Sequence, residues 1–173
     1  MMPTTARTAE RSASGGLEAL YVAHAPVALR FAFYLSGDRE QARDLVQEAF
    51  VRVAGRFAHL RKPDVFATYL RRTIVNLHTS RLRRLRLERA YVAREASRRT
   101  PDAEAPDPTE RDEVWHAILV LPPRQRAAIV LRFYEDLTER EAAEILNCSV
   151  GAVNQLVARA TAALRERFGE GSA

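Results

Sequence analysis

The sequence predicts an all-α protein built from two small helical domains joined by an acidic linker that contains prolines. Apolar residues recur at three- and four-residue spacing along most of the chain, and no stretch alternates as a half-buried strand does. The net charge changes sign sharply near the middle of the chain. Close to the C-terminus, two short amphipathic segments joined by a tight turn are typical of a helix-turn-helix.

Composition limits the class of protein. Of the 173 residues, 47% are hydrophobic and 28% are charged, so a globular fold is expected. The formal net charge of +5 favours nucleic acid or another anionic surface as the partner. Lys62 is the only lysine, so the abundance of arginine is a general bias of the chain and no single arginine carries the argument.

Cysteine content and hydropathy point to the cytoplasm. The single cysteine, Cys148, excludes an internal disulfide and a multi-cysteine metal site. No uninterrupted apolar run approaches the ~18 residues of a membrane span. Residues 1–16 lack the apolar stretch of a signal peptide, and we expect them to form a disordered tail. We therefore predict a cytoplasmic protein with no membrane partner.

The first domain is expected at residues 17–99, with three helices. The first helix starts at Leu17, and Pro26 kinks it or marks its start. Asp38 and Gln41 resemble a capping box ahead of the second helix, whose apolar face extends to Phe57. A turn at residues 62–64 precedes the third helix, which begins near Val65.

Charge marks the linker. Residues 71–99 contain ten arginines against two glutamates, a net charge of +8. Residues 101–114 contain six acidic residues against one arginine, a net charge of −5. This acidic segment holds three prolines and almost no large apolar residue, so we expect an extended linker at residues 100–109.

The second domain is expected at residues 110–168, followed by a short tail at residues 169–173. Pro122-Pro123 separates its first two helices. Thr138 and Glu141 form a capping box for the first helix of the helix-turn-helix. Asn147 tolerates the left-handed backbone of the turn, and Ser149 caps the second helix.

The second helix of this motif is the candidate recognition helix, which enters the DNA major groove in such proteins. Asparagine and glutamine side chains read adenine edges, and small residues contact thymine methyl groups. An ordinary helical hairpin of a bundle has the same apolar pattern. The candidate DNA-binding residues are Ser149, Val150, Gly151, Asn154, Gln155, Ala158 and Arg159.

No catalytic constellation is visible in the sequence. The four histidines are scattered and show no metal-binding spacing. The chain also lacks a glycine-rich phosphate loop and a Gly-x-Ser-x-Gly motif. We therefore expect a binding protein and not an enzyme, with no cofactor and no metal site.

Two further surfaces suit binding. The arginine-rich third helix would neutralise phosphates, and its Tyr69, Asn76 and His78 offer stacking surfaces and base-edge contacts for unpaired strands. A surface helix with an arginine-rich, solvated side is the alternative interpretation, but a net charge of +8 within 29 residues makes it the weaker one. On the second helix, Asp44, Gln47 and Glu48 form a mixed acidic and amide face that suits a protein partner better than DNA. From the residues alone, however, we interpret it as a solvated face.

Three motifs resemble those of bacterial RNA polymerase sigma factors. GDREQARDLVQEAFVRV resembles their most characteristic segment, with Arg43 in place of an acidic residue. FATYLRRTIVNLHTSRLRR resembles their promoter-melting helix, with Tyr69 for tryptophan and Ser80 for aspartate. The run from Leu121 to Arg165 resembles their C-terminal helix-turn-helix, with Asn154 and Gln155 where basic residues are usual. The length and the missing middle region resemble the small two-domain extracytoplasmic-function (ECF) group.

The resemblance implies a role for each surface. The first domain would bind core polymerase and melt the −10 element, with Asn76 near a pocket for a flipped base, and the second would read the −35 element. The residues that match those by which the family docks on the clamp helices of the largest polymerase subunit are Asp44, Gln47 and Glu48. Those matching the −10 reader are Tyr69, Arg72, Asn76, His78, Arg81, Arg83 and Arg84.

Further partners follow from the same resemblance. The second domain would contact the flap of the other large polymerase subunit, and the acidic linker would run toward the RNA exit path. Members of this family are often held by an anti-sigma protein. Two alternatives stay open from the residues alone: a helix-turn-helix regulator that binds operators as a dimer, and a structural or adaptor protein.

Overall fold

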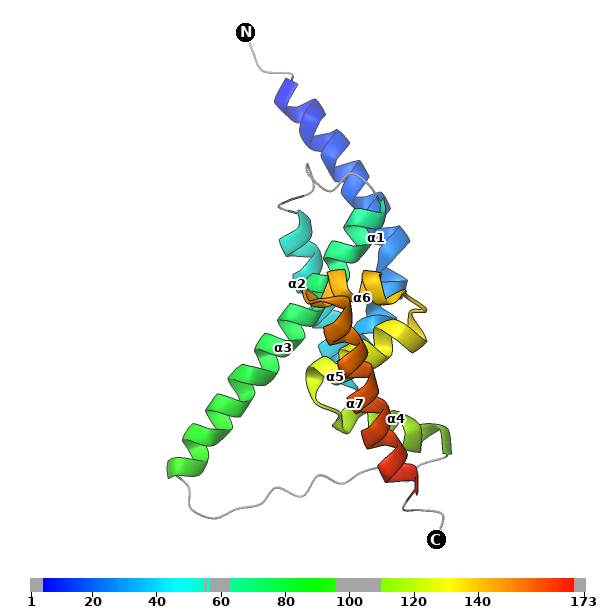
Figure 1. The fold of residues 1–173 in the computed structure, drawn as a ribbon. Helices are drawn as coiled ribbons and strands as arrows, with labels where there is room; N and C mark the ends of the chain where they lie inside the picture. The colour runs from blue at the N-terminus through cyan, green and yellow to red at the C-terminus, as the bar shows by residue number, and fades with distance from the viewer. Residues whose placement is uncertain (1–4, 55, 57–62, 96–109, 170–173) are drawn as a thin grey trace.

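The structure, a computed structural model, describes residues 5–54, 56, 63–95 and 110–169 (Figure 1). Every regular element in this part of the chain is a helix, which confirms the expected all-α class. The expected linker at residues 100–109 and the end of the second predicted helix lie outside the described residues. The elements are α1 (Thr5–Ser36), α2 (Arg39–Ala54), α3 (Pro63–Glu95), α4 (Glu110–Val120), α5 (Pro123–Ile129), the π-helical turn η2 (Val130–Tyr134), α6 (Glu139–Leu146) and α7 (Val150–Gly169).

Helix α1 is longer than the sequence predicted. It begins at Thr5, so the expectation of a disordered tail is wrong for residues 5–16. Adding a residue to an existing helix needs only one more hydrogen bond, whereas starting a helix is costly, so the packed part of α1 can extend toward the N-terminus. Pro26 lies inside α1, where the sequence allowed a kink or a helix start.

One part of α1 has the composition of a membrane span. Among the described residues, Glu18–Ser36 is long and apolar enough to cross a membrane, with a mean hydropathy of 1.2. The sequence argument counted uninterrupted apolar residues and therefore did not detect this average. Phe31 and Leu35 of this stretch are buried in the protein core, and the core helix of a soluble protein meets the same criterion.

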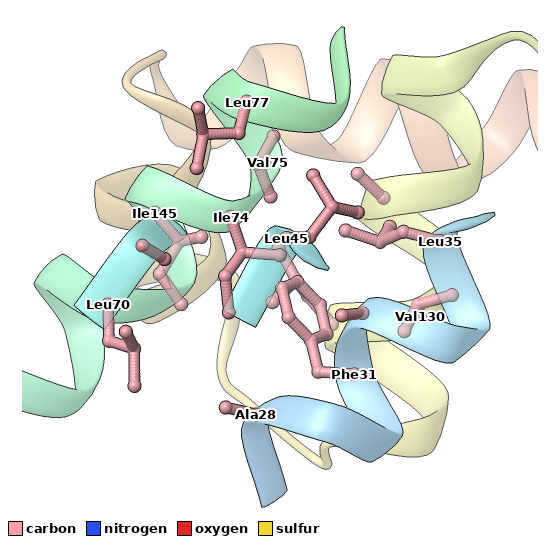
Figure 2. Packing of buried hydrophobic residues seen from close by; sticks show 14 of the residues in the cluster. Ala28, Phe31, Leu35, Leu45, Leu70, Ile74, Val75, Leu77, Val130 and Ile145 are labelled. Carbon is pink, nitrogen blue, oxygen red and sulfur yellow. The ribbon is translucent and has the colours of Figure 1, made fainter. Parts of the chain in front are cut away.

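Helices α1, α2 and α3 pack around an apolar interior. Phe31 from α1, Leu45 from α2 and Ile74 from α3 are each almost fully buried and lie together in Figure 2. Burying a side chain of this size stabilises the fold by roughly 1.5–3 kcal/mol. Helix α2 starts where expected, because the Asp38 carboxylate accepts a hydrogen bond of 2.7 Å from the Gln41 backbone N–H.

The second domain contains the predicted helix-turn-helix. Both hydrogen bonds of the capping box between Thr138 and Glu141 are present. Asn147 has the left-handed backbone (φ 49°) expected of the turn, and the Ser149 hydroxyl accepts a 3.2 Å hydrogen bond from the Ala152 backbone N–H. These contacts orient α7 against α6 through the buried Val153.

The two domains share one hydrophobic core. Val130 and Ile145 of the second domain belong to the same buried cluster as Phe31, Leu70 and Ile74 of the first domain. In Figure 2 Val130 lies beside Leu35, and Ile145 lies beside α3. The sequence predicted two helical domains but not this packing, because it depends on contacts between residues far apart in the chain.

His78 lies in this interior and makes the fold sensitive to pH. Its side chain is only 5% exposed. Burial lowers the pKa of His78 to about 4, and the charges of Arg126 and Arg81 act in the same direction. The folded protein therefore binds the histidine proton less readily than the unfolded chain does.

We expect the free energy of unfolding to fall by about 2 kcal/mol on account of His78 between pH 7.5 and 5. The unfolded histidine has a pKa near 6.5, so its contribution is fully present above that pH and is lost as the pH falls toward the folded value of about 4. Urea titrations of the wild type and of His78→Gln measure the difference. Equal losses in both proteins would show that His78 is not the titrating group.

Candidate protein and nucleic-acid interfaces

The acidic and amide face of α2 is an exposed stripe. Asp44 and Gln47 are exposed, and Glu48 is partly exposed. Val51 follows one turn after Gln47 and is 69% exposed, although it is apolar. Because these residues are spaced by three and four positions, they lie along one side of the helix. We name Asp44, Gln47, Glu48 and Val51 the α2 face; the sequence analysis did not include Val51.

Glu48 connects the α2 face to the basic helix. One carboxylate oxygen accepts a 2.7 Å hydrogen bond from Arg52, and the other accepts one of 2.9 Å from Arg81. The hydrogen bond from Arg81 is the main reason that the pKa of Glu48 is lowered. Two residues expected at different surfaces, Glu48 for a protein and Arg81 for DNA, are therefore paired with each other.

A pocket of about 420 Å³ lies between the end of α2 and the first half of α3. Tyr69, Thr73 and Asn76 line it from α3, and Arg52 and Arg56 line it from the α2 side. Arg56 donates a hydrogen bond to the Tyr69 hydroxyl, and its guanidinium carbon lies 5.7 Å from the centre of the Tyr69 ring. The pocket thus combines an aromatic ring, an amide and two cations.

Of the five residues that line the pocket, the sequence analysis named Tyr69 and Asn76. Thr73 could have been added, because it lies four residues after Tyr69 on the same side of α3. Arg52 and Arg56 could not, because their position depends on how the chain returns from α2 to α3. Among the pocket residues on α3, Tyr69 is half-buried and Asn76 is exposed.

The arginines expected at the −10 reader are not in one group. Arg83 and Arg84 are exposed on the part of α3 that projects beyond the packed domains (Figure 1). Arg84 pairs with Glu88 at 3.3 Å. Arg72 instead faces the second domain, where its Nε donates a 3.0 Å hydrogen bond to the Glu144 carbonyl oxygen.

His78 does not belong to this surface, in contrast to the sequence expectation. It follows Ile74 by four residues and therefore continues the buried stripe of α3. Its Nε2 is buried and has no hydrogen-bond partner. In this structure His78 cannot contact a nucleic acid, and we exclude it from the candidate surface.

The candidate recognition helix α7 presents all of its expected residues to solvent. Positions 149, 150, 151, 154, 155, 158 and 159 are exposed. A Cβ atom on Gly151 would meet no atom within 4 Å, so packing does not require a glycine there. The amide nitrogen of Asn154 donates a 3.2 Å hydrogen bond to the Glu139 carboxylate at the start of α6.

Metal chemistry has no support in the described part of the chain. No group of three or more histidine, cysteine, aspartate or glutamate side chains is arranged there to hold an ion. The arrangement offers three candidate binding surfaces instead: the α2 face, the pocket with the basic α3, and the exposed side of α7.

Comparisons with known proteins identify two family regions in the chain. The family model for sigma-70 region 2 matches residues 20–88, and the model for sigma-70 region 4 matches residues 111–164. The RNA polymerase sigma-E factor of Streptomyces avermitilis is 36% identical over 144 residues, which are 81% of this chain and 78% of that protein. The ECF RNA polymerase sigma factor SigE of Mycolicibacterium smegmatis is 32% identical over 92% of this chain and 64% of that protein.

Solved structures have the same fold. CnrH, solved in complex with the cytosolic domain of CnrY, is 26% identical and covers 95% of this chain and 96% of its own, with a TM-score of 0.63. The sigma factor RpoE of Bartonella quintana, solved with the anti-sigma factor NepR, is 23% identical and has a TM-score of 0.62 over 86% of this chain and 94% of its own. With both family regions matched and relatives of this identity, the chain belongs to the ECF group of RNA polymerase sigma factors, which bind core polymerase and direct promoter-specific transcription.

Proposed function

We propose that each of the three surfaces of this sigma factor has a separate role in transcription initiation. The α2 face docks on the clamp helices of the largest polymerase subunit, α3 and its pocket read and melt the −10 element, and α7 reads the −35 element in duplex form. The pocket carries this proposal, because it brings together side chains of the kinds that capture an unpaired base, next to the basic helix.

The α2 face suits a protein partner by its chemistry. Asp44 and Gln47 can make polar contacts with a partner. Val51, one turn further along the same helix, adds an exposed apolar side chain. Exposed apolar side chains on such a stripe gain free energy when a partner removes them from water. On the basis of the family resemblance, we assign the clamp helices of the polymerase as the partner of this face, with Glu48 at its edge.

The pocket suits a flipped base. Extruding a base costs a few kcal/mol of stacking and pairing, which contacts in the pocket must offset. Tyr69 offers a ring for stacking, and stacking on an aromatic side chain is worth about 1–3 kcal/mol per base. The Asn76 amide can donate to and accept from a base edge, while Arg52 and Arg56 can hold the adjacent phosphates.

Helix α7 suits base reading more than phosphate binding. Its exposed side carries the amides of Asn154 and Gln155 and the small residues Gly151 and Ala158. Arg159 is the nearest exposed cation for a phosphate. Because the exposed side of α7 carries so few charges, polymerase has to supply much of the affinity for the promoter. We assign the flap of the other large polymerase subunit as the contact of the second domain.

The remaining assignments follow from family membership. The chain acts as a transcription initiation factor without catalysis of its own, and we place it in the cytoplasm with the polymerase. An anti-sigma partner stays a prediction. A stand-alone dimeric regulator is not favoured, because it leaves the match to region 2 without a function.

We expect the double change Asp44→Arg with Gln47→Ala to weaken binding to core polymerase by at least tenfold. It places a cation and a shortened side chain at the centre of the α2 face, and central interface residues typically cost 2 kcal/mol or more when altered. Fluorescence titration of the labelled full-length chain with core polymerase measures the loss. Binding of the same protein to a −35 duplex should not change.

Glu113→Arg provides the matched control, because it makes the same charge reversal at an exposed position of α4, outside the three surfaces. The control should bind core polymerase as the wild type does. Equal weakening of polymerase binding and of −35 binding in the double variant would contradict the role of the α2 face.

We expect Asn76→Ala to reduce open-complex formation by about 5- to 150-fold, equivalent to losing a base contact of 1–3 kcal/mol. Asn76 is exposed, so the fold should be unaffected. Permanganate footprinting of the assembled holoenzyme on a promoter fragment measures the loss, and a fragment with mismatches at −10 removes the cost of melting but not the loss of base capture. The control Val120→Ala changes an exposed residue of α4, outside the three surfaces. A full rescue of Asn76→Ala by the mismatched fragment would count against base capture.

A further inference from the structure

The side chain of Asn154 on the candidate recognition helix α7 is held by a residue outside that helix. Its Nδ2 donates a hydrogen bond of 3.2 Å to the carboxylate of Glu139, which lies 15 positions earlier at the start of α6. Both residues are exposed, so this hydrogen bond lies on the surface of the helix-turn-helix and not in its core. It therefore joins the two helices of the motif on the side that the proposed function turns toward DNA.

The chemistry of the acceptor decides which way the Asn154 amide faces. An asparagine amide has a nitrogen that donates two hydrogen bonds and an oxygen that only accepts them. An ionised carboxylate also only accepts, so Glu139 attracts the amide nitrogen and repels the amide oxygen. Turning the amide by half a rotation would place two oxygens against each other. Glu139 thus selects one of the two orientations between which an exposed asparagine otherwise exchanges.

The selected orientation leaves Asn154 with the groups that match one base. One N–H of the amide is used by Glu139, so the second N–H and the carbonyl oxygen stay available together. The major-groove edge of adenine presents an acceptor, N7, and a donor, the N6 amino group, and asparagine pairs with both. Guanine presents two acceptors, N7 and O6, which a cationic side chain matches better. The oriented amide is therefore complementary to adenine.

The Glu139 carboxylate adds discrimination through repulsion. A negative charge beside the amide disfavours the two acceptors of guanine, and specific interfaces commonly use such a repulsive element against the wrong partner. The same charge repels the phosphates of any duplex, so it lowers affinity for all sequences. A residue of this kind acts on the choice of sequence and not on the strength of binding.

The surface beside Asn154 is open to an approaching base pair. Gly151 lies three residues before Asn154 and Ala158 lies four residues after it, so both flank the amide along the same side of α7. Both are exposed, and a Cβ atom on Gly151 would meet no atom within 4 Å. With a small residue on each side, a base edge can reach the amide without displacing a larger side chain.

We propose that Glu139 is a positioning residue, which fixes the Asn154 amide so that α7 selects an A·T pair at one position of the −35 element. The inference rests on the proposed function, because it requires α7 to read that element in duplex form. It names the base pair and a residue outside α7 that sets the choice. Because sigma factors usually have a basic residue at position 154, this choice does not follow from the family pattern.

The test measures base preference and affinity separately. Holoenzyme assembled from core polymerase and the full-length chain is mixed with a promoter fragment at which the wild-type holoenzyme starts transcription, with the −35 element randomised. Sequencing of the bound fraction gives the preference at each position. The wild type should prefer an A·T pair at one position, and Asn154→Ala should lower that preference by about 5- to 150-fold, as expected for one bidentate base contact.

Glu139→Ala should lower the same preference by about 2- to 10-fold, which corresponds to one hydrogen bond. Its affinity averaged over all sequences should stay the same or rise, because a negative charge is removed, whereas loss of a merely structural contact would weaken binding to every sequence alike. In the Asn154→Ala background, Glu139→Ala should change the preference no further. In the Gln155→Ala background its effect should persist, because the hydrogen bond from Asn154 is still present.

Three further variants keep the test decisive. Asn154→Lys should move the preference at this position from A·T to G·C, since lysine pairs with the acceptors of guanine. Glu166→Gln removes an exposed carboxylate from a later part of α7 and should match the wild type. Circular dichroism checks the folding of each variant. If Glu139→Ala unfolds, Glu139→Gln replaces it, because a glutamine keeps the size but can donate as well as accept and so selects no orientation.

The outcomes separate this inference from the proposed function. If Asn154→Ala removes a preference that both Glu139 variants leave intact, the positioning role is overturned while the role of α7 stands. A preference for another base pair at the position that Asn154 controls would also overturn the inference alone. If the wild-type holoenzyme shows no preference anywhere in the −35 element, the proposed role of α7 fails, and the positioning role fails with it.

Discussion

The burial of one side of α3 is the constraint on which the rest of the structure depends. Phe66, Leu70 and Ile74 form a stripe that packs against α1 and α2, and the same cluster extends to Ile145 of the second domain. This packing fixes the rotation of α3 about its axis, and so decides that Tyr69, Thr73 and Asn76 line the pocket on the other side. Site and core are two sides of a single helix.

The arginines of α3 show how a basic helix can serve two purposes. Arg71 pairs with Glu135, Arg72 donates to a carbonyl oxygen of α6, and Arg81 pairs with Glu48. Arg83 and Arg84, in contrast, are exposed. Several arginines that suit phosphate binding are therefore already bonded to carboxylate or carbonyl oxygens of the protein itself. A net charge of +8 on this segment overstates the number of cations available to DNA before any rearrangement.

Features of short range could be predicted from the sequence, and features of long range could not. The caps at Asp38, Thr138 and Ser149 depend on residues within four positions, and the structure contains each of them. The apolar spacing of α2 likewise predicted its buried residues. Glu135 gave no such signal, because its partners lie 64 and 105 positions away. His78 was misjudged for a related reason: its polar character suggested a surface, while its spacing from Ile74 placed it in the interior.

The helix-turn-helix illustrates how the local and the distant contacts combine. Its own hydrogen bonds set the angle between α6 and α7, and Asn154 is held by Glu139 across that angle, so contacts within the protein organise the candidate recognition surface. Contacts of α6 with α3 then decide where this prepared surface points. Because α7 exposes few cations, we expect its position relative to α3 to matter more for promoter choice than its own affinity for DNA.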